Sequence, residues 1–261
     1  MESLTRTGVA VILNNHISDA KWCCDPMDGN GLWFNRKYTA TQWQNAIVSL
    51  SARYASNPLV IGNDLRNEIR SDIKNGLIPE WGTGSETDWA KAATECGNEV
   101  LKVAPDQLVI IEGMRSANNL RPIRDHWIEL NVPNKLVYSY HMYSFQPVTS
   151  YKTYDKYEAG LEPNVGYLLE DGHPYTAPLW LGEFGENQDN NYWSFTMRWL
   201  SEHDQVGWSQ WAWNGYKTTP DEDESYGIME ADMATVRQQW MLDDLAPIQT
   251  QPTSAFEQIT Q

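Results

Sequence analysis

The sequence is short of basic residues and has no long apolar run. It holds 19 lysines and arginines against 35 aspartates and glutamates, which gives a formal net charge of −16. Nucleic acids and acidic membrane surfaces would be repelled by this charge, so we expect a neutral or cationic partner and no nucleic-acid binding. No stretch of 18 apolar residues occurs, and we therefore predict no membrane-spanning helix.

Cysteine is also scarce. The three cysteines, Cys23, Cys24 and Cys96, are too few for a disulfide-rich scaffold, and their odd number leaves the redox compartment open. Two adjacent cysteines do not easily bridge to each other, so a disulfide would have to join Cys96 to one of the other two. Residues 1–13 contain only a short apolar run without a small-residue cleavage site, so we predict no signal peptide in this chain.

The motifs of several enzyme classes are missing as well. The sequence has no glycine-rich phosphate loop and no Gly-x-Ser-x-Gly elbow, which disfavours nucleotide and serine-hydrolase chemistry. His16, Asp19 and the Cys23–Asp25 segment carry metal-ligand types, but their spacing matches none of the zinc patterns. We therefore predict neither a metal site nor a cofactor.

Tryptophan and tyrosine, by contrast, are abundant. The chain has 13 of each and only five phenylalanines, whereas aromatic residues selected for core packing alone would include more phenylalanine. Tryptophan and tyrosine combine a flat apolar face with a polar group, which suits wet binding sites such as those for sugar rings. Large core residues that happen to be tryptophan are the alternative.

Short apolar runs alternate with longer segments of helical spacing. Near-continuous apolar character without strict alternation is typical of strands that are buried on both faces. Repeated strand–helix alternation indicates an α/β fold with a parallel sheet, either open or closed into a barrel. The predicted strands are Gly8–Leu13, Leu59–Gly62, Gln107–Ile111, Lys135–Tyr140, Leu179–Leu181 and Val206–Trp211. The predicted helices are Thr41–Tyr54 with Trp43, Ile47, Leu50 and Tyr54 on one face, Asp88–Val103 with Trp89, Ala92, Cys96, Val100 and Val103 on one face, Trp193–Leu200 and Met233–Leu245.

Polar or ionisable residues follow nearly every predicted strand at its carboxyl end. In α/β barrels the active site is built from the carboxyl ends of the strands, whereas a doubly wound sheet concentrates it at one switch point. Six strands that each contribute polar groups therefore favour the barrel. These groups are Asn14-Asn15-His16, Arg66-Asn67-Glu68, Glu112, His141 with Tyr143, Glu183 and Trp213-Asn214.

Two of these carboxylates form a candidate catalytic pair. Glu183 directly follows an apolar run, where an unpaired buried charge would be costly, and Glu68 ends another. A salt bridge is the alternative for each, more so for Glu68 because Arg66 and Arg70 are close in sequence. Retaining glycosidases use one carboxylic acid and one nucleophilic carboxylate ~5–5.5 Å apart. The role of Glu112, substrate contact or salt-bridge partner, stays open.

From about residue 7 to residue 245 the chain resembles glycoside hydrolase family 5, the cellulase family of retaining (β/α)8 barrels. Asn-Glu or Gly-Glu-Phe-Gly alone would be a weak signal. Together, in the order that the family has and at the ends of predicted strands, the motifs are a strong signal for this family. The likeness is strongest to the plant and fungal branch, and it rests on Asn14-Asn-His16, Trp22-Cys-Cys24, Asp28-Gly-Asn-Gly-Leu-Trp33, Leu65-Arg-Asn-Glu68 and Gly182–Gly185.

The resemblance implies a role for each matching residue. Glu68 would be the acid/base, and Glu183 the nucleophile. Like-charge repulsion would keep the first protonated and the second ionised. The remaining implied contacts are Asn67 with the sugar 2-hydroxyl, Tyr143 and His141 beside the nucleophile with Tyr143 orienting it, His16 with sugar hydroxyls, and Trp211, or alternatively Trp213, as the stacking platform.

The sequence departs from the family pattern in two places. Ile69 follows the predicted acid/base, where the family commonly has proline, and this fits the plant and fungal branch. The first predicted strand aligns with the family's third, so the resemblance implies an incomplete barrel that covers strands 3 to 8, without the arginine of strand two. We expect a truncated barrel domain at residues 1–245, a flexible tail at 246–261, and a monomer when the full barrel is present. With two apolar edge strands unpaired, this chain alone would fold poorly or be weakly active.

The implied function is hydrolysis of a β-linked polysaccharide or oligosaccharide. β-Glucan, β-mannan and glycolipid substrates all stay open, because loops set the substrate; an endo-β-1,4-glucanase is the first choice by analogy. Secretion is implied by the family alone. The alternative is a non-catalytic glycan-binding barrel or an inactive fragment, and the presence of both glutamates favours the enzyme.

Overall fold

The computed structural model describes residues 1–21, 23–146 and 151–249 of the chain. These residues form two compact units, which we call the first and the second unit. The first comprises Met1–Ser139 and Gly172–Ala177, and the second comprises Tyr140–Asp171 and residues 178–249. The single barrel domain at 1–245 stays a prediction. Of the predicted tail, Ala246–Ile248 forms the 3-10 turn η4, and residues 250–261 lie outside the described part.

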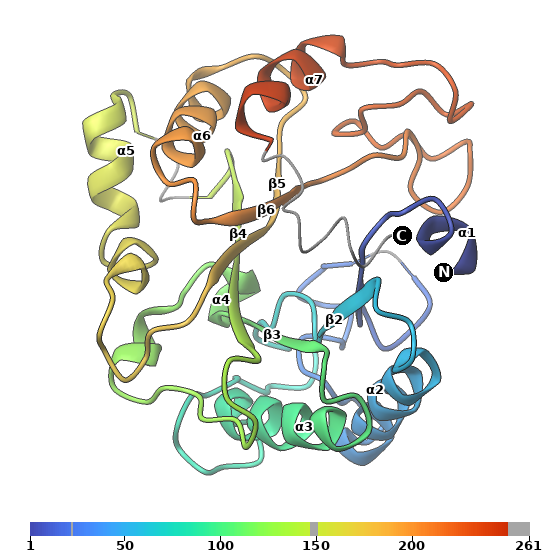
Figure 1. Cartoon of the computed structure of the whole chain (residues 1–261), viewed down its shortest axis with the longest axis vertical. Coiled ribbons are helices and arrows are strands. Elements are labelled where there is room, and N and C mark those ends of the chain that lie inside the picture. Colours follow the sequence, from blue (N-terminus) through green and yellow to red (C-terminus); the bar gives the residue numbers. More distant parts are fainter. Residues whose placement is uncertain (22, 147–150, 250–261) are drawn as a thin grey trace. The chain divides into compact units, whose positions relative to one another are not determined.

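Parallel strands form the centre of the first unit. They are β1 (Val11–Asn14), β2 (Val60–Asp64), β3 (Leu108–Glu112) and the beginning of β4 (Leu136–Tyr143), and they pair in sequence order (Figure 1). Apart from the half-exposed Ile61 and Leu108, β2 and β3 are buried throughout, as expected from their apolar runs. β1 pairs with β2 on one side, and its residues Val11–Leu13 are half-exposed.

Except for the last one, which ends at Gln210 rather than at Trp211, the strands extend further toward their carboxyl ends than the apolar runs predicted. β3 includes Glu112, β4 continues to Tyr143, and β5 (Leu179–Gly185) includes Glu183. Backbone pairing continues past the last apolar side chain, as between Glu112 and Ser139, because the backbone groups pair whatever side chain they carry. The side chains of Glu112, His141, Tyr143 and Glu183 therefore lie within the carboxyl-terminal parts of strands and are held by the sheet itself.

Two amphipathic helices cover these strands. α2 (Ala40–Tyr54) begins with a capping box between Thr39 and Gln42, and Asp88 caps α3 (Trp89–Val103). Figure 1 shows the two helices side by side next to β2 and β3. Two predicted core residues are instead on the outer edge of their helices: Leu50 is 40% exposed and Val103 is 38% exposed. The short segments are α1 (Glu2–Thr5), α4 (Met114–Ala117) and η1 (Arg121–Arg124).

Three tryptophans make up a large part of this core. The buried rings of Trp33, Trp43 and Trp89 lie within 5.2–6.3 Å of one another, measured between centroids. Each helical indole also binds the backbone near a strand end. The Trp43 Nε1–H donates to the Leu65 carbonyl at 3.0 Å, and the Trp89 Nε1–H donates to the Glu112 carbonyl at 2.9 Å. For these residues core packing, not sugar binding, explains the tryptophan.

The second unit pairs β5 with β6 (Gly207–Gln210) in parallel. Its other elements are α5 (Tyr154–Leu161), η3 (Gly166–Leu169), α6 (Asn191–Glu202) and α7 (Gln239–Leu245). The Trp193 indole of α6 donates to Asp244 of α7 at 2.8 Å. Our predicted helix from Met233 was wrong before Gln239. Asp232 accepts hydrogen bonds from the next turn, and Met233 has a φ of 56°, which is outside the helical region.

Cys23 and Cys24 form a disulfide with each other. Our expectation that the adjacent pair would not easily bridge is therefore wrong, as is a disulfide from Cys96 to either of them. Cys96 is a free, buried cysteine of α3, so it has no disulfide partner in the described part of the chain. Burial raises the pKa of its thiol, which keeps it unreactive.

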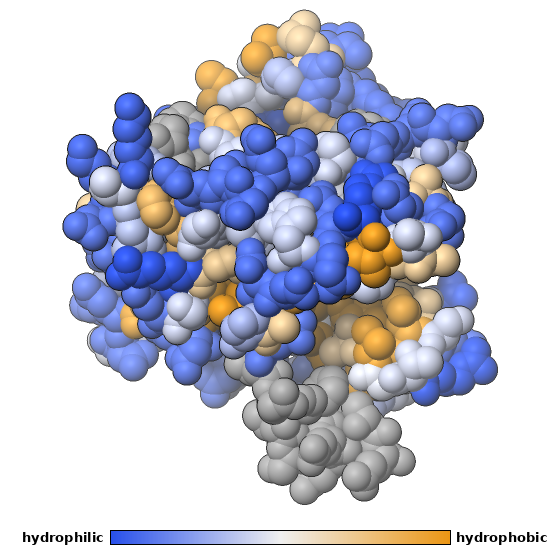
Figure 2. All heavy atoms as spheres, turned by 90° about the horizontal axis from the view of Figure 1, so that it is seen from above, coloured by the Kyte–Doolittle hydropathy of each residue, from blue (hydrophilic) through white to orange (hydrophobic). Residues whose placement is uncertain are grey.

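Among the described residues, no helix combines the length and the apolar character needed to cross a bilayer. Figure 2 shows mainly hydrophilic side chains on the face that it draws, with apolar residues interspersed among them.

Thiol titration tests the cysteine assignment. Without a reductant, we expect almost no reaction in the folded protein and one thiol per chain in denaturant, because only Cys96 is free. After reduction in denaturant, all three cysteines should react. The Cys96→Ala variant is the control and should show no thiol before reduction. Three thiols in unreduced, denatured protein would contradict the disulfide.

The indole bond of Trp89 predicts a stability effect. We expect Trp89→Phe to lower the free energy of unfolding by about 1–3 kcal/mol, because the buried Glu112 carbonyl loses its indole donor. Trp127→Phe is the matched control, since the Trp127 indole binds Glu129 at an exposed position; its effect should stay within about 0.5 kcal/mol. Urea unfolding measures both. Equal effects of the two substitutions would show that burial of the bond is irrelevant.

Candidate active site

His16 follows β1, and the two asparagines that precede it fix its position. The Asn14 amide donates to Asp64 at the end of β2 at 2.9 Å, and its carbonyl oxygen lies 3.0 Å from the Nδ1 atom of His16. Asn15 binds the segment after β2 instead, because its side-chain oxygen accepts from Arg66 at 3.0 Å. The Asn-Asn-His motif therefore joins the ends of two neighbouring strands and holds the imidazole there.

Glu68 lies in an irregular segment directly after β2. Its backbone has a φ of 46°, in the left-handed region that non-glycine residues seldom adopt. Its N–H donates to Glu112 Oε2 at 2.6 Å, and its carbonyl accepts from Arg70 Nη1 at 3.2 Å. The preceding N–H, that of Asn67, donates to the Asn15 carbonyl at 3.1 Å. Both polar backbone groups of Glu68 are thus bound by side chains, and the Glu68 side chain itself is half-buried.

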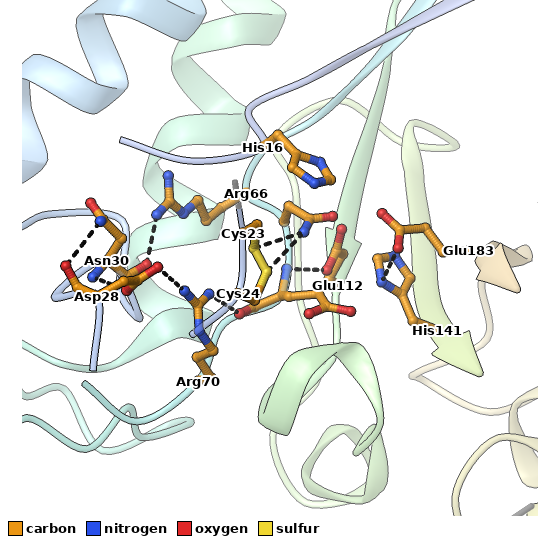
Figure 3. The surroundings of a disulfide bond; sticks show 12 residues. His16, Cys23, Cys24, Asp28, Asn30, Arg66, Arg70, Glu112, His141 and Glu183 are labelled. Carbon is orange, nitrogen blue, oxygen red and sulfur yellow. Dashed lines mark hydrogen bonds and ion pairs between the residues drawn. A yellow bond between two sulfur atoms is a disulfide. The ribbon is translucent and has the colours of Figure 1, made fainter. Parts of the chain in front are cut away.

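The Asp28–Trp33 motif folds against the two arginines of this segment. Asp28 and Arg70 form a buried ion pair with a distance of 2.8 Å, and the Asn30 carbonyl accepts from Arg66 at 2.9 Å (Figure 3). The Arg70 N–H donates to the Gly31 carbonyl at 2.9 Å. Any side chain at Gly31 would collide with the Arg70 backbone, which explains the glycine. The motif therefore supports the segment that carries Glu68.

Charge compensation keeps the buried Arg66 ionised. Burial, followed by the neighbouring Arg70 guanidinium, lowers the pKa of Arg66 to about 10, while the carboxylates of Glu112 and Asp28 raise it. The side chain therefore stays positively charged at neutral pH. A buried charge without such partners would be strongly destabilising, so the two arginines and the two carboxylates depend on one another.

The Cys23–Cys24 disulfide lies against the residue that precedes Glu68. The Asn67 side-chain amide is 3.8 Å from one sulfur and 3.9 Å from the other, and Asn67 itself is buried (Figure 3). Trp22, the first residue of this sequence motif, lies outside the described residues. The disulfide and the Asn15 backbone together fix the side chain that we expect to meet the sugar 2-hydroxyl.

In the second unit, β4 and β5 bring three of the predicted residues together. The Tyr143 hydroxyl donates to Glu183 Oε2 at 2.9 Å, and His141 Nδ1 lies 3.5 Å from the same oxygen. Both residues come from the end of β4 and are buried, whereas 14% of the Glu183 side chain is exposed. In Figure 3 the side chains of His141 and Glu183 point toward one another. A partly accessible carboxylate is thereby held in one orientation.

The two candidate platforms differ in their environment. Trp211 follows β6 directly, and its N–H donates to the Phe184 carbonyl at 2.8 Å, next to Glu183 in β5. A side chain at Gly185 would meet the Trp211 carbonyl, so the glycine permits this close approach. Trp213 is 56% exposed. The ring of Phe145, which is 72% exposed, stacks on Tyr143 at 5.3 Å between centroids and is a further aromatic surface that the sequence did not indicate.

The predicted site residues thus fall into two groups, one in each unit. The first unit holds His16, Asn67 and Glu68, and the second holds His141, Tyr143, Glu183, Trp211 and Trp213. Their catalytic and binding roles stay predictions. Asp28 and Arg70 are supports that we did not predict, whereas Glu112 had been named as a substrate contact or a salt-bridge partner; the signal in the sequence was the pair of arginines beside Glu68, which require buried acidic partners.

Comparison with known proteins gives the family of the chain. The family model described as cellulase (glycosyl hydrolase family 5) matches residues 1–217. A glycosyl hydrolase 5 family protein from Chamaecyparis obtusa is 30% identical over 264 residues, which cover 95% of this chain and 46% of that protein. An endoglucanase from Paenibacillus polymyxa is 31% identical over 206 residues, which cover 71% of this chain and 47% of that protein. The chain thus spans about half the length of these curated relatives.

A solved structure gives the fold class. The catalytic domain of the major endoglucanase from Xanthomonas campestris pv. campestris matches with a TM-score of 0.73 and 27% identity, over 93% of this chain and 70% of that one. The parallel strands therefore belong to the (β/α)8-barrel class, of which they form a part. Because the family model covers most of its residues, the chain belongs to glycosyl hydrolase family 5, the cellulase family.

Proposed function

We propose that this protein is a retaining glycoside hydrolase that cleaves β-linked polysaccharide, with Glu183 as nucleophile and Glu68 as acid/base. β-1,4-Glucan is the proposed substrate, since relatives with similar sequences are named endoglucanases. One of these is named an extracellular endoglucanase, which supports secretion as part of the same proposal.

The hydrogen bond from Tyr143 to Glu183 carries this proposal. A hydroxyl donor favours the ionised form of a carboxylate, which is the form that a nucleophile needs. The bond goes to Oε2, and together with His141 it fixes the plane of the carboxylate. A structural salt bridge to an arginine was the alternative role for Glu183, and the contacts with Tyr143 and His141 support the catalytic role.

The surroundings of Glu68 support an acid/base role. Its segment is tied to β1, β3 and the Asp28–Trp33 motif through backbone contacts, and these contacts leave the side chain half-buried rather than packed into the core. General acid–base catalysis needs such a group at a fixed position, because proton transfer requires hydrogen-bond distance to the reacting oxygen.

The reaction would take place in two displacements. Glu183 attacks the anomeric carbon while the glycosidic C–O bond breaks and Glu68 donates its proton to the leaving oxygen. Glu68, now a carboxylate, then takes a proton from water, which attacks the same carbon and releases Glu183. Asn67, His16 and a tryptophan platform would hold the sugar during both steps.

Reducing-sugar release from soluble β-glucans and β-mannans tests the proposal. We expect Glu183→Gln to reduce hydrolysis to below about one thousandth, since removing a nucleophile costs several orders of magnitude. Glu68→Gln should reduce it about 10²–10⁴-fold. Glu186→Gln is the matched control: Glu186 is a buried carboxylate of the same segment that binds Asn187 and Asn190, and its loss should leave most of the activity.

The outcome separates the enzyme from its alternatives. Full activity in Glu183→Gln would reject the assigned nucleophile. If the parent protein binds the β-glucans or β-mannans but hydrolyses none of them, this would instead support the non-catalytic glycan-binding barrel.

A further inference from the structure

Glu68 has a backbone conformation that its own side chain does not favour. A φ of 46° is uncommon for a residue other than glycine, asparagine or aspartate, and it persists where the surrounding structure determines it. Because the side chain starts at the Cα atom, this backbone conformation decides in which direction the Glu68 carboxyl group points. The groups that hold the backbone of this residue therefore also place its side chain.

Glu112 is the principal holding group. Its Oε2 atom accepts the Glu68 N–H at 2.6 Å, a short hydrogen bond to an acceptor that is charged when the side chain is ionised. Glu112 is fully buried and is the last residue of β3, where it pairs with Ser139 of β4. The Trp89 indole binds its carbonyl as well. The backbone of Glu112 is thus held by the pairing of β3 with β4 and by the indole donated from α3.

Charge alone does not explain this carboxylate. Charge compensation is one part of its role: of the two carboxylates that raise the pKa of the buried Arg66, Glu112 contributes more than Asp28, which also forms the ion pair with Arg70. An apolar pair of the same volume is often as stable as a buried ion pair. In addition, Glu112 accepts a hydrogen bond from the N–H group of Glu68, whose backbone is left-handed.

We propose that Glu112 is a positioning residue for Glu68: its buried carboxylate holds the backbone of the acid/base glutamate and so aims the carboxyl group that transfers the proton. This inference rests on the proposed function of Glu68. The substitutions that test it are Glu112→Leu, which removes the acceptor at similar volume, and Glu112→Gln, which keeps a neutral acceptor oxygen.

The first experiment compares two substrates that differ in their need for an acid. A cellooligosaccharide has a sugar leaving group that must be protonated, whereas 2,4-dinitrophenyl β-cellobioside has a leaving group that departs without a proton. We expect Glu112→Leu to lower kcat/KM for the cellooligosaccharide about 10²-fold, because a small misplacement of a catalytic group has effects of this size. For the dinitrophenyl substrate, kcat/KM should change less than about threefold, and Glu112→Gln should lie between the parent and Glu112→Leu.

The matched control is Gln107→Leu, at the other end of the same strand. Gln107 is buried and accepts a hydrogen bond from Asn63 at 2.7 Å, so its loss destabilises the same sheet without touching the Glu68 segment. Both substrates should respond equally to Gln107→Leu. An equal response of both substrates to Glu112→Leu would overturn the positioning role and leave only a structural one.

Amide hydrogen exchange tests the same contact without any catalysis. In the parent protein the Glu68 N–H should exchange slowly, because it is bound to a buried acceptor. It should exchange at least about tenfold faster in Glu112→Leu, while amides in the centre of β2 keep their rates and Gln107→Leu leaves the Glu68 rate unchanged. Equal Glu68 exchange rates in the parent and Glu112→Leu would overturn the proposal even if Glu112→Leu loses activity.

The two readouts separate this inference from the proposed function. If Glu68→Gln keeps full activity, or the parent protein hydrolyses neither substrate, the acid/base assignment fails, and with it the positioning of an acid, whatever the exchange rates are. If Glu68→Gln shows the substrate-dependent loss and Glu112→Leu does not, the assignment of Glu68 stands and the positioning role alone is rejected.

Discussion

Two arginines in the interior of the first unit set the constraint on which its site depends. Arg66 and Arg70 are buried just after β2, where each positive charge must find oxygen ligands or destabilise the fold. Their partners come from distant parts of the sequence: Asp28 and the Asn30 carbonyl from one loop, and Asn15 from the end of β1. Because the Glu68 segment lies between the two arginines, satisfying them also fixes its position.

The fold was predictable to the extent that it follows from apolar patterning. All six strands and the helices α2, α3 and α6 lie where short apolar runs and helical spacing placed them. The ends of β1 to β5 were placed too early because pairing depends on the backbone, which continues through polar residues such as Glu112. The start of α7 was missed because Asp232 bonds to the following turn, and such a local contact overrides helical spacing.

The candidate site was predictable in its residues but not in its supports. Carboxylates at strand ends are conspicuous in the sequence, and the resemblance to the cellulase family implied the contact of Tyr143 with Glu183 that the structure contains. The bond from the Glu68 N–H to Glu112 could not be foreseen, because it depends on a left-handed backbone and on residues 44 positions apart. The ion pair of Asp28 with Arg70 is likewise a long-range contact.

The bridge between Cys23 and Cys24 also affects how the surroundings of Glu68 behave in alkaline solution. Two free thiols at this place would ionise at about pH 8–9 and bring negative charge toward the glutamate. A disulfide has no proton to lose, so the sulfurs beside Asn67 stay neutral at every pH. The alkaline behaviour of this part of the molecule is therefore left to groups such as Arg66, whose pKa burial lowers to about 10, and the sulfur atoms serve as a constant, weakly polar surface.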